Sequence, residues 1–496
     1  MKKAFLCFLL VFVLVFAGAA VAAMSLHQSR DQVTVTTITQ VGDPAAVQGL
    51  TARQTVGCGG YLQWDLSIPL DRPETSSTRF SYASRYHVID DYEPDGIWIV
   101  PADNAAFFYT GVTLDSLADD SSPVQTLLAP LFRSVAEKTQ PGCRYTEDVR
   151  LKDYTDIYPL QVSFDGYYGS DLPWQARYQK APSWYSIDDS LRQALQTFFS
   201  FPVPQEEIWA ITVEKDENGA ITELNYESKT SPSIILNTSA VWSDTDLYFA
   251  FDQHSYGLPS FHQVPGGYGV YHLSITPEED TVYLELDSLE TLVSLPEGSM
   301  VLDLALSGDE SSLLLTYGLG PDTFFLVLDP ETGEARQSFS VPARPAGTVE
   351  TATLDSEGNP QGTYTSPYWS TESILIGENF TVLYGDDTLY LYTLENGTYT
   401  YAFSAPMQTH LRSGYSYDHL YGAWNGTQLA LGSVSGLQAL SLSVYEGGQL
   451  QYHGVYKTSL GDVASTASQP EEDEFSMESD SLALFPEQAL TLVWEG

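Results

Sequence analysis

Basic residues are scarce in this chain. Among 496 residues, 21 are Lys or Arg and 65 are Asp or Glu, which gives a formal net charge of −44. After Thr230 the only basic residues are Arg336, Arg344, Arg412 and Lys457. A surface of this sign repels phosphate backbones and anionic lipids. The composition therefore excludes nucleic acid as a partner and predicts a strongly hydrated acidic surface.

Cysteine is also scarce, with three in the chain. Cys7 lies in the apolar N-terminal segment, which leaves Cys58 and Cys143. No Cys-x-x-Cys pair is present, so the sequence does not favour thiol redox chemistry or a zinc ribbon. In an oxidising compartment the two remaining cysteines predict one disulfide, Cys58–Cys143, with two unrelated free thiols as the alternative.

Motifs for nucleophilic or metal-dependent catalysis are missing. The sequence has no Gly-x-Ser-x-Gly elbow and no His-Glu-x-x-His. The densest group of acid–base residues contains His254, His262 and His272, together with Ser255 and Ser260. A histidine near a serine is usually a hydrogen-bonded loop residue, so this group does not by itself predict catalysis.

The N-terminus predicts export. Residues 1–22 hold two lysines, then an apolar run, then the small residues Ala20-Val21-Ala22, which is the order of a cleavable signal peptide. The alternative is an uncleaved membrane anchor, because residues 4–23 are long enough to span a bilayer. Either way the protein is expected to be secreted or held at the cell surface, with the membrane contacted only through this segment.

Residues 33–204 are expected to form a mixed region of strands and two short helices. The first helix is expected to begin at Ser122 and to be kinked or split at Pro130. Its apolar face would comprise Val124, Leu127, Leu128, Leu131 and Val135. The second helix is expected to begin at Ser186, which forms a capping-box-like pair with Asp189. Its buried stripe would comprise Ile187, Leu191, Ala194, Leu195 and Phe198.

Residues 205–496 alternate short strands with glycine-containing turns. Three segments share one pattern, in which a strand, a polar turn, a strand, an acidic glycine turn and a third strand follow one another. They are "LLLTYGLGPDTFFLVLDPETGEARQSFSV", "FTVLYGDDTLYLYTLENGTYTYAFSA" and "TQLALGSVSGLQALSLSVYEGGQLQYHGVY".

These segments resemble the blades of the β-propeller superfamily, and turns such as "VLDPETGEA" are similar to those of quinoprotein-like and WD-like blades. The resemblance covers roughly Ile208 to Gly496, and the chain also resembles exported bacterial proteins. It implies a ring of four-stranded blades around a central cavity. The predicted fold class is therefore mainly β, a propeller-like ring with a mixed α/β N-terminal region. A β-sandwich pair is the alternative. The last segment, "SLALFPEQALTLVWEG", is expected to close the ring with an N-terminal strand.

The stretch "TVEKDENGAITELNYE" partly fits a calcium-binding loop. Glu214, Asp216 and Asn218 place oxygen atoms at alternate positions, and Gly219 is sixth. Its flanks predict strands instead of the helices that such a loop needs, and Asn-Gly favours a hairpin turn. We therefore predict a hairpin and no cofactor, with Asp216 and Asn218 as weak calcium ligands in the alternative.

Aromatic residues are abundant, at 13% of the chain. Two stretches gather them around turns, "SGYSYDHLYGAW" and "DGYYGSDLPWQARYQKAPSWYS". Aromatic rings on loops make rigid platforms for sugars or peptides. The residues predicted to contact a ligand are Tyr415, Tyr417, Tyr421, Trp424, Trp174 and Trp184. Because tyrosine also favours strands, the alternative is that these side chains belong to the core.

These observations favour a non-catalytic exported binding or scaffold protein whose ligand is an extracellular glycan or protein. The alternative is an extracellular hydrolase or lyase that acts on a polymer through paired carboxylates. Buried acids with raised pKa values would favour the enzyme. Exposed aromatic platforms would favour binding.

Overall fold

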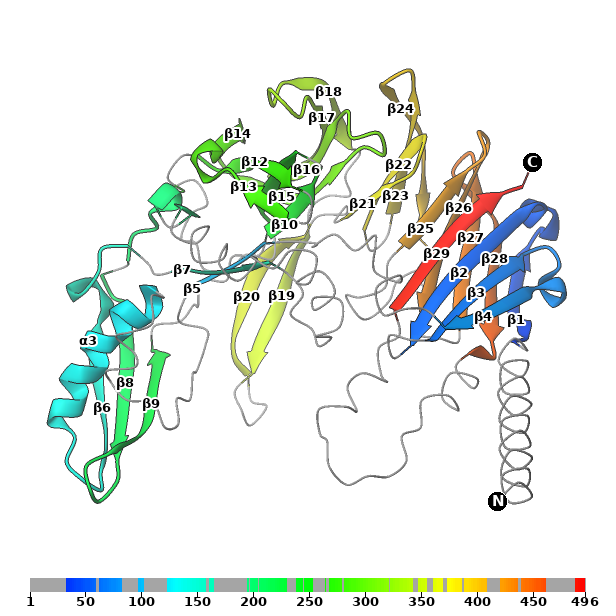
Figure 1. Ribbon diagram of the computed structural model, residues 1–496. Coiled ribbons are helices and arrows are strands. Elements are labelled where there is room, and N and C mark those ends of the chain that lie inside the picture. Colours follow the sequence, from blue (N-terminus) through cyan, green and yellow to red (C-terminus); the bar gives the residue numbers. More distant parts are fainter. Residues whose placement is uncertain are drawn as a thin grey trace, which may run out of the picture. The chain divides into compact units, whose positions relative to one another are not determined.

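The described part of the chain is mainly β, as the sequence predicts (Figure 1). The computed structural model describes residues 33–58, 62–82, 97–101, 123–157, 160–164, 194–195, 197–203, 205–229, 238–243, 245–252, 264, 267–278, 281–320, 322–341, 347–354, 360–368, 373–385, 388–407, 420–435, 439–460 and 487–495. No helix among these residues is long and apolar enough to cross a membrane.

Two compact units make up the chain. Unit 1 comprises residues 1–92, 169–176 and 375–496, and unit 2 comprises residues 93–168 and 177–374. Four-stranded antiparallel sheets occur in both, which confirms the expected mainly-β architecture. The closure of these sheets into a ring stays a prediction, as does the alternative of a β-sandwich pair.

One sheet of unit 1 joins the two ends of the chain. Its order is β29-β2-β3-β4, and these strands span Glu487–Trp494, Leu50–Cys58, Leu62–Pro69 and Ser77–Tyr82. β29 pairs with β2 along its whole length, and Leu490 and Leu492 of β29 are buried in one hydrophobic cluster with Trp64 of β3. The expectation that the last segment pairs with an N-terminal strand is therefore confirmed.

A second sheet of unit 1 has the order β1-β28-β27-β26-β25. These strands span Val35–Gly42, Gln449–Thr458, Ala439–Glu446, Gln428–Ser435 and Leu420–Trp424. A further sheet has the order β21-β22-β23-β24, spanning Ser373–Ile376, Phe380–Tyr384, Thr388–Glu395 and Thr398–Pro406. Two of the three repeated sequence segments form β22–β24 and β26–β28, so the strand pattern predicted for them is confirmed.

Unit 2 contains the remaining repeated segment in a sheet of four consecutive strands. These are β15, β16, β17 and β18, spanning Ser299–Leu306, Leu313–Leu319, Asp322–Leu328 and Ala335–Val341. A neighbouring sheet has the order β10-β11-β12-β13, and β14 also pairs with β12. Its strands span Thr238–Trp242, Asp246–Phe251, Gly269–Glu278, Thr281–Leu284 and Glu290–Ser294.

Smaller elements complete the described chain. Two two-stranded pairs are β19 with β20, spanning Gly347–Leu354 and Pro360–Tyr368, and β5 with β7, spanning Ile97–Pro101 and Leu160–Phe164. Short 3-10 helices span Pro44–Val47, Pro73–Thr75, Leu151–Asp153 and Leu286–Ser288.

A helix packs on a small sheet elsewhere in unit 2. The helix α3 spans Pro123–Lys138 and contacts β8 of the sheet β6-β8-β9, whose strands span Arg144–Arg150, Ile208–Lys215 and Ile221–Ser228. Leu131 and Val135 are buried as predicted, and Lys215 Nζ donates to the C-terminal carbonyl of Ala136 at 2.6 Å. The helix continues through Pro130, because the residues on either side of this exposed proline are buried. The split expected at Pro130 is therefore wrong, and the alternative of a kink stays a prediction.

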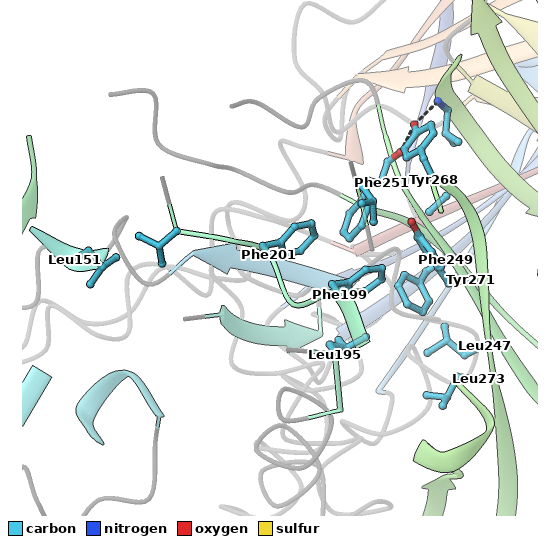
Figure 2. Close-up of a cluster of buried hydrophobic side chains, with 14 of the residues drawn as sticks. Leu151, Leu195, Phe199, Phe201, Leu247, Phe249, Phe251, Tyr268, Tyr271 and Leu273 are labelled. Atoms are coloured by element: carbon cyan, nitrogen blue, oxygen red, sulfur yellow. Dashed lines mark hydrogen bonds between the residues drawn. The ribbon is translucent and has the colours of Figure 1, made fainter. Parts of the chain in front are cut away.

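The second predicted helix is described only at residues 194–195 and 197–199, which are helical. Leu195 is buried as predicted, and Phe198 packs against the main hydrophobic cluster of unit 2. Its expected start at Ser186 lies outside the described residues. Figure 2 shows Phe199 from this segment among aromatic side chains of β11 and β12. Its ring lies 4.8 Å from Tyr271, measured between centroids, and 5.0 Å from Phe251.

Candidate functional site

The aromatic residues that the sequence offers as ligand contacts divide into two groups. Trp174, Trp184, Tyr415 and Tyr417 lie outside the described residues. Tyr421 and Trp424 lie in β25 and are half-buried: Tyr421 packs against one hydrophobic cluster of unit 1, and Trp424 packs against another. Trp424 lies 6.4 Å from the ring of Phe403. These two side chains support the sheet, and a ligand-binding role for all six residues stays a prediction.

The calcium-like stretch forms the hairpin between β8 and β9, as predicted. Asp216 Oδ1 accepts from the backbone N–H of Asn218 at 2.9 Å and of Ala220 at 2.7 Å. Gly219 has φ +87°, a conformation that glycine adopts without strain, and its N–H donates to the Asp216 carbonyl. Asp216 therefore stabilises the turn, and calcium at Asp216 and Asn218 stays an untested alternative.

The predicted disulfide is not observed directly. Cys143 is exposed and is a free thiol in the structure. The side chain of Cys58 lies outside the described residues. Pairing of Cys58 with Cys143 stays a prediction.

The site with the richest chemistry lies in unit 2, where His272 of β12 sits between two carboxylates. We call Asp246, Tyr248, His272 and Glu290 the His272 cluster. Sheet register brings them together, because His272 pairs with Tyr248 of β11 and with Glu290 of β14. Asp246 is two residues before Tyr248 and therefore shares its face of β11.

The two ring nitrogens of His272 have different surroundings. Nε2 lies 2.6 Å from Oδ1 of Asp246, whereas Nδ1 lies 3.6 Å from Oε1 of Glu290 and, although buried, has no hydrogen-bond partner. The His272 side chain is 14% exposed and that of Glu290 is 62% exposed. Asp246 is held in place, because its Oδ2 accepts from Thr245 Oγ1 at 2.6 Å.

The ring of Tyr248 lies against one side of the imidazole. Nearby negative charges act on its hydroxyl group. Its ring lies 5.3 Å from that of His272, with 31° between the planes. Burial raises the pKa of its hydroxyl far above the usual value, and the charges of Asp246, Glu331, Asp329 and Glu310 raise the pKa further. Acids from several turns are therefore near enough to this buried tyrosine to influence its hydroxyl.

Two of these turns are built around aspartates and are joined by an arginine. Asp309 accepts from the hydroxyls of Ser307 and Ser311, and these bonds lower the pKa of its carboxyl group. Asp329 accepts from Arg336 Nη2 at 2.6 Å, which, with the Thr332 N–H, lowers its pKa to about 2. Arg336 also donates to the carbonyl of Ser311 at 2.6 Å, so it connects the two turns.

The turn of residues 329–334 packs directly on the strand that carries Glu290. Gly333 has φ +68°, and a Cβ atom there would lie 2.4 Å from the carbonyl oxygen of Leu292 in β14. Only glycine fits this close approach. We call Asp246, Glu290, Glu310, Asp329 and Glu331 the acidic end of unit 2.

The acidic end suits a cation or a donor of several hydrogen bonds. Glu290, Glu310 and Glu331 are exposed, while Asp329 is compensated by Arg336. Within the described ranges, no three or more His, Cys, Asp or Glu side chains gather closely enough to hold a metal ion. The Asp246–His272 pair also has the geometry in which a carboxylate orients an imidazole for proton transfer.

The sequence pattern indicated His272 as an acid–base residue but did not indicate its partners. Asp246 and Tyr248 carry a weak signal, because an i, i+2 pair in a strand shares one face. No sequence signal marks Glu290, because its approach to His272 depends on the pairing of β12 with β14. His254 and His262 lie outside the described residues.

No protein-family model matches the sequence, and the search of curated proteins finds no match. Among solved structures, the chain is similar to the Myceliophteria thermophila Cps50 (Swd1) β-propeller domain at 13% identity and a TM-score of 0.24, covering 50% of this chain and 68% of that one.

Two further structures are similar at the same level. An oligogalacturonate lyase in complex with manganese is 16% identical, with a TM-score of 0.24 over 53% of this chain and 55% of the lyase. A Dos1 propeller is 10% identical, with a TM-score of 0.23 over 51% of this chain and 64% of that one.

Proposed function

We propose that the protein is an exported, non-catalytic binding or scaffold protein whose acidic end contacts cationic groups of its ligand. Lysine or arginine side chains of an extracellular protein are the cations that this surface would meet. The observation that carries the proposal is that four carboxylates from separate turns and strands lie near enough to Tyr248 for their charges to raise the pKa of its hydroxyl. Export is supported by the signal-like residues 1–22.

The two turns that carry Glu310 and Glu331 are fixed in place by contacts with other parts of unit 2. Arg336 links the turn of residues 307–312 to the turn of residues 329–334, and Gly333 seats the second turn on β14. Turns whose backbone is fixed by such contacts lose little conformational entropy when a ligand binds. A concentrated negative potential also speeds the encounter with a cationic partner, in a manner that salt weakens.

Binding of a nona-lysine peptide to the intact chain tests the proposal. Fluorescence anisotropy is measured in EDTA at low and at physiological salt. The double variant Glu290→Gln/Glu331→Gln is expected to bind about tenfold more weakly than the unaltered chain. The control Glu378→Gln/Glu395→Gln removes the same charge from exposed residues of unit 1 and is expected to leave affinity within about twofold.

The outcomes separate a specific surface from the general charge of −44. Equal weakening by both double variants would overturn the proposal, because it would show diffuse attraction only. A second arm uses oligomers of glucosamine and of N-acetylglucosamine. Tight binding of the N-acetylated oligomer, independent of Glu290 and Glu331, would favour the neutral glycan ligand that the sequence also allows.

The second candidate is the extracellular hydrolase or lyase. The specific observation in its favour is the 2.6 Å contact between Asp246 and His272, which leaves Nδ1 able to accept a proton. Release of reducing ends from anionic and neutral polysaccharides is the appropriate assay. Activity that is lost in His272→Gln would support the enzyme, and activity that the variant retains would assign it elsewhere.

A further inference from the structure

We propose that Asn396 is a site of spontaneous deamidation, in which the backbone nitrogen of Gly397 attacks the asparagine side chain. The sequence contains three Asn-Gly pairs, Asn218-Gly219, Asn396-Gly397 and Asn425-Gly426. Because glycine has no Cβ atom to hinder the attacking nitrogen, the dipeptide alone makes the three pairs equivalent. The hydrogen bonds of the folded chain distinguish them. This inference does not depend on the binding function proposed above.

The reaction needs only water as a co-reactant. The Gly397 nitrogen forms a bond to Cγ of Asn396, and the bond from Cγ to Nδ2 breaks. The side-chain nitrogen leaves as ammonia and takes the proton that the Gly397 nitrogen loses. Water then opens the cyclic imide at either carbonyl, which yields aspartate or isoaspartate. A reactive pair therefore needs a side-chain amide and a following backbone N–H that are both free to move.

Asn396 and Gly397 form the two-residue turn between β23 and β24. Glu395 pairs with Thr398, and φ is +51° at Asn396 and +74° at Gly397, as in a type I′ turn. Both turn residues are exposed, and a Cβ atom at Gly397 would meet no atom within 4 Å beyond its chain neighbours. Neither the Asn396 side chain nor the Gly397 N–H makes a hydrogen bond to another described residue. Both reacting groups are therefore free.

The side chain of Asn425 is held by the turn between β25 and β26. Its Oδ1 accepts from the backbone N–H of Thr427 at 3.0 Å and from that of Gln428 at 2.8 Å. Both hydrogen bonds fix the amide in an Asx turn. They must be broken or strained before the amide carbon meets the Gly426 nitrogen, so they slow the reaction at Asn425.

At Asn218 the attacking nitrogen itself is engaged. The Gly219 N–H donates to the Asp216 carbonyl at 3.0 Å. Asn218 donates to the Asp216 carboxylate through its backbone N–H at 2.9 Å and through Nδ2 at 3.5 Å. The negative charge of Asp216 also opposes the charge that develops on the amide oxygen during attack. Asn218 is therefore expected to react slowly, although its turn is exposed.

Peptide mass spectrometry of the intact chain, incubated in mildly alkaline buffer, tests the site. Labelling with an isoaspartate-specific methyltransferase confirms the product. Asn396 is expected to convert about tenfold faster than Asn218 or Asn425, because it alone breaks no side-chain hydrogen bond. In concentrated urea the three pairs are expected to convert at similar rates, because the hydrogen bonds of the folded state are lost.

Two variants complete the test. Asn396→Gln is expected to remove the fast conversion, because a glutamine side chain closes a larger ring more slowly. Asp216→Ala frees the Asn218 side chain and is expected to speed conversion there several-fold, while Asn396 keeps its rate. Conversion of Asn218 or Asn425 as fast as Asn396 in the folded chain would overturn the proposal. The same ranking in urea would also overturn it, because local sequence and not the fold would then set the rates.

Discussion

Two sheets with the same number of strands are assembled from the chain in opposite ways. In unit 2, β15 to β18 are consecutive and join through short turns within residues 299–341. In unit 1, β2, β3 and β4 are joined by β29, which lies at the other end of the chain. Local pairing needs little loop closure, whereas pairing of distant segments must offset the entropy of closing a long loop.

The difference shows where stability and chemistry lie in this protein. The unit 1 sheet depends on a single terminal strand that supplies buried Leu490 and Leu492. The local turns of unit 2 are free to carry acidic residues, and two of them place Glu310 and Glu331 near Tyr248. We therefore expect unit 1 to be sensitive to its chain ends, and unit 2 to hold the ligand-contact surface.

Deletion of residues 487–496 should have the largest effect. It removes two buried leucines and exposes the edge of β2, and each lost leucine contributes about 2 to 5 kcal/mol. Hydrogen exchange is expected to become fast throughout unit 1 and to stay slow in residues 313–328 of unit 2. Deletion of Gly496 alone is the control. If residues 50–58 stay protected from hydrogen exchange in the variant that lacks residues 487–496, the proposed dependence of unit 1 on its terminal strand would be contradicted.

Paired core substitutions should affect the units separately. Trp64→Ala in unit 1 and Phe199→Ala in unit 2 each remove a fully buried aromatic side chain, at an expected cost of about 3 to 5 kcal/mol. Denaturant unfolding followed by peptide-level hydrogen exchange measures each effect. Loss of protection in both units from either change would show one cooperative body instead of two.

Tyr268→Phe should destabilise unit 2 by about 1 to 3 kcal/mol. The hydroxyl donates to the Phe251 carbonyl at 2.9 Å and accepts from the Val301 N–H at 2.7 Å, so its removal takes a hydrogen-bond partner from each. The change in unfolding free energy is measured in urea. Tyr401→Phe in unit 1 removes the hydroxyl of an exposed tyrosine and is expected to change stability by less than about 0.5 kcal/mol. Equal losses of unfolding free energy in the two variants would contradict the stabilising role of the Tyr268 hydroxyl.

Asp329→Asn should have the smallest effect, and its effect should depend on pH. The pKa of Asp329 is lowered from 3.8 to about 2, chiefly by the hydrogen bond from Arg336. The stabilisation is therefore fully present above about pH 4 and is lost as the pH falls to about 2. Because the pair is partly exposed, its expected contribution is about 1 kcal/mol or less.

Urea unfolding at pH 7, 4, 3 and 2 measures that difference between the unaltered chain and the variant. The control is Asp322→Asn, an exposed residue at the start of β17. A difference that grows as the pH falls would contradict the sign of the shift.

Local patterns in the sequence predicted much of the fold. Alternating apolar residues and acidic glycine turns indicated β16–β18, β22–β24 and β26–β28, because two-residue periodicity and turn chemistry are both local. The hairpin at Asp216 followed from the same logic. The pairing of β29 with an N-terminal strand was predicted from the propeller resemblance, not from local pattern.

Whether an aromatic side chain lies on the buried or the exposed face of its strand was harder to predict. Tyr399 of β24 is buried and Tyr401 is exposed, although both lie in one tyrosine-rich stretch. A register shift between Leu391 and Tyr392 changes the pairing of β23 with β24. Burial along β24 therefore departs from strict alternation at Tyr401, and no composition signal marks such an irregularity. The same limit applies to Tyr421 and Trp424, whose half-burial in β25 could not be derived from composition.

The candidate site was predictable only in part. His272 stood out as an acid–base residue, but its partners come from β11 and β14, and sheet pairing decides that contact. The acidic turns looked like ordinary turns, because aspartate and glycine serve the backbone there. Their arrangement is a tertiary property, because Arg336 links the two turns and Gly333 packs against β14.

Hydrogen exchange of the intact chain, with and without the nona-lysine peptide, tests the central claim most directly. We expect slower exchange in residues 290–294, 307–312 and 329–334 of unit 2 when the peptide is bound, and no change in the sheets of unit 1. Protection confined to unit 1, or spread evenly over the acidic surface, would contradict it.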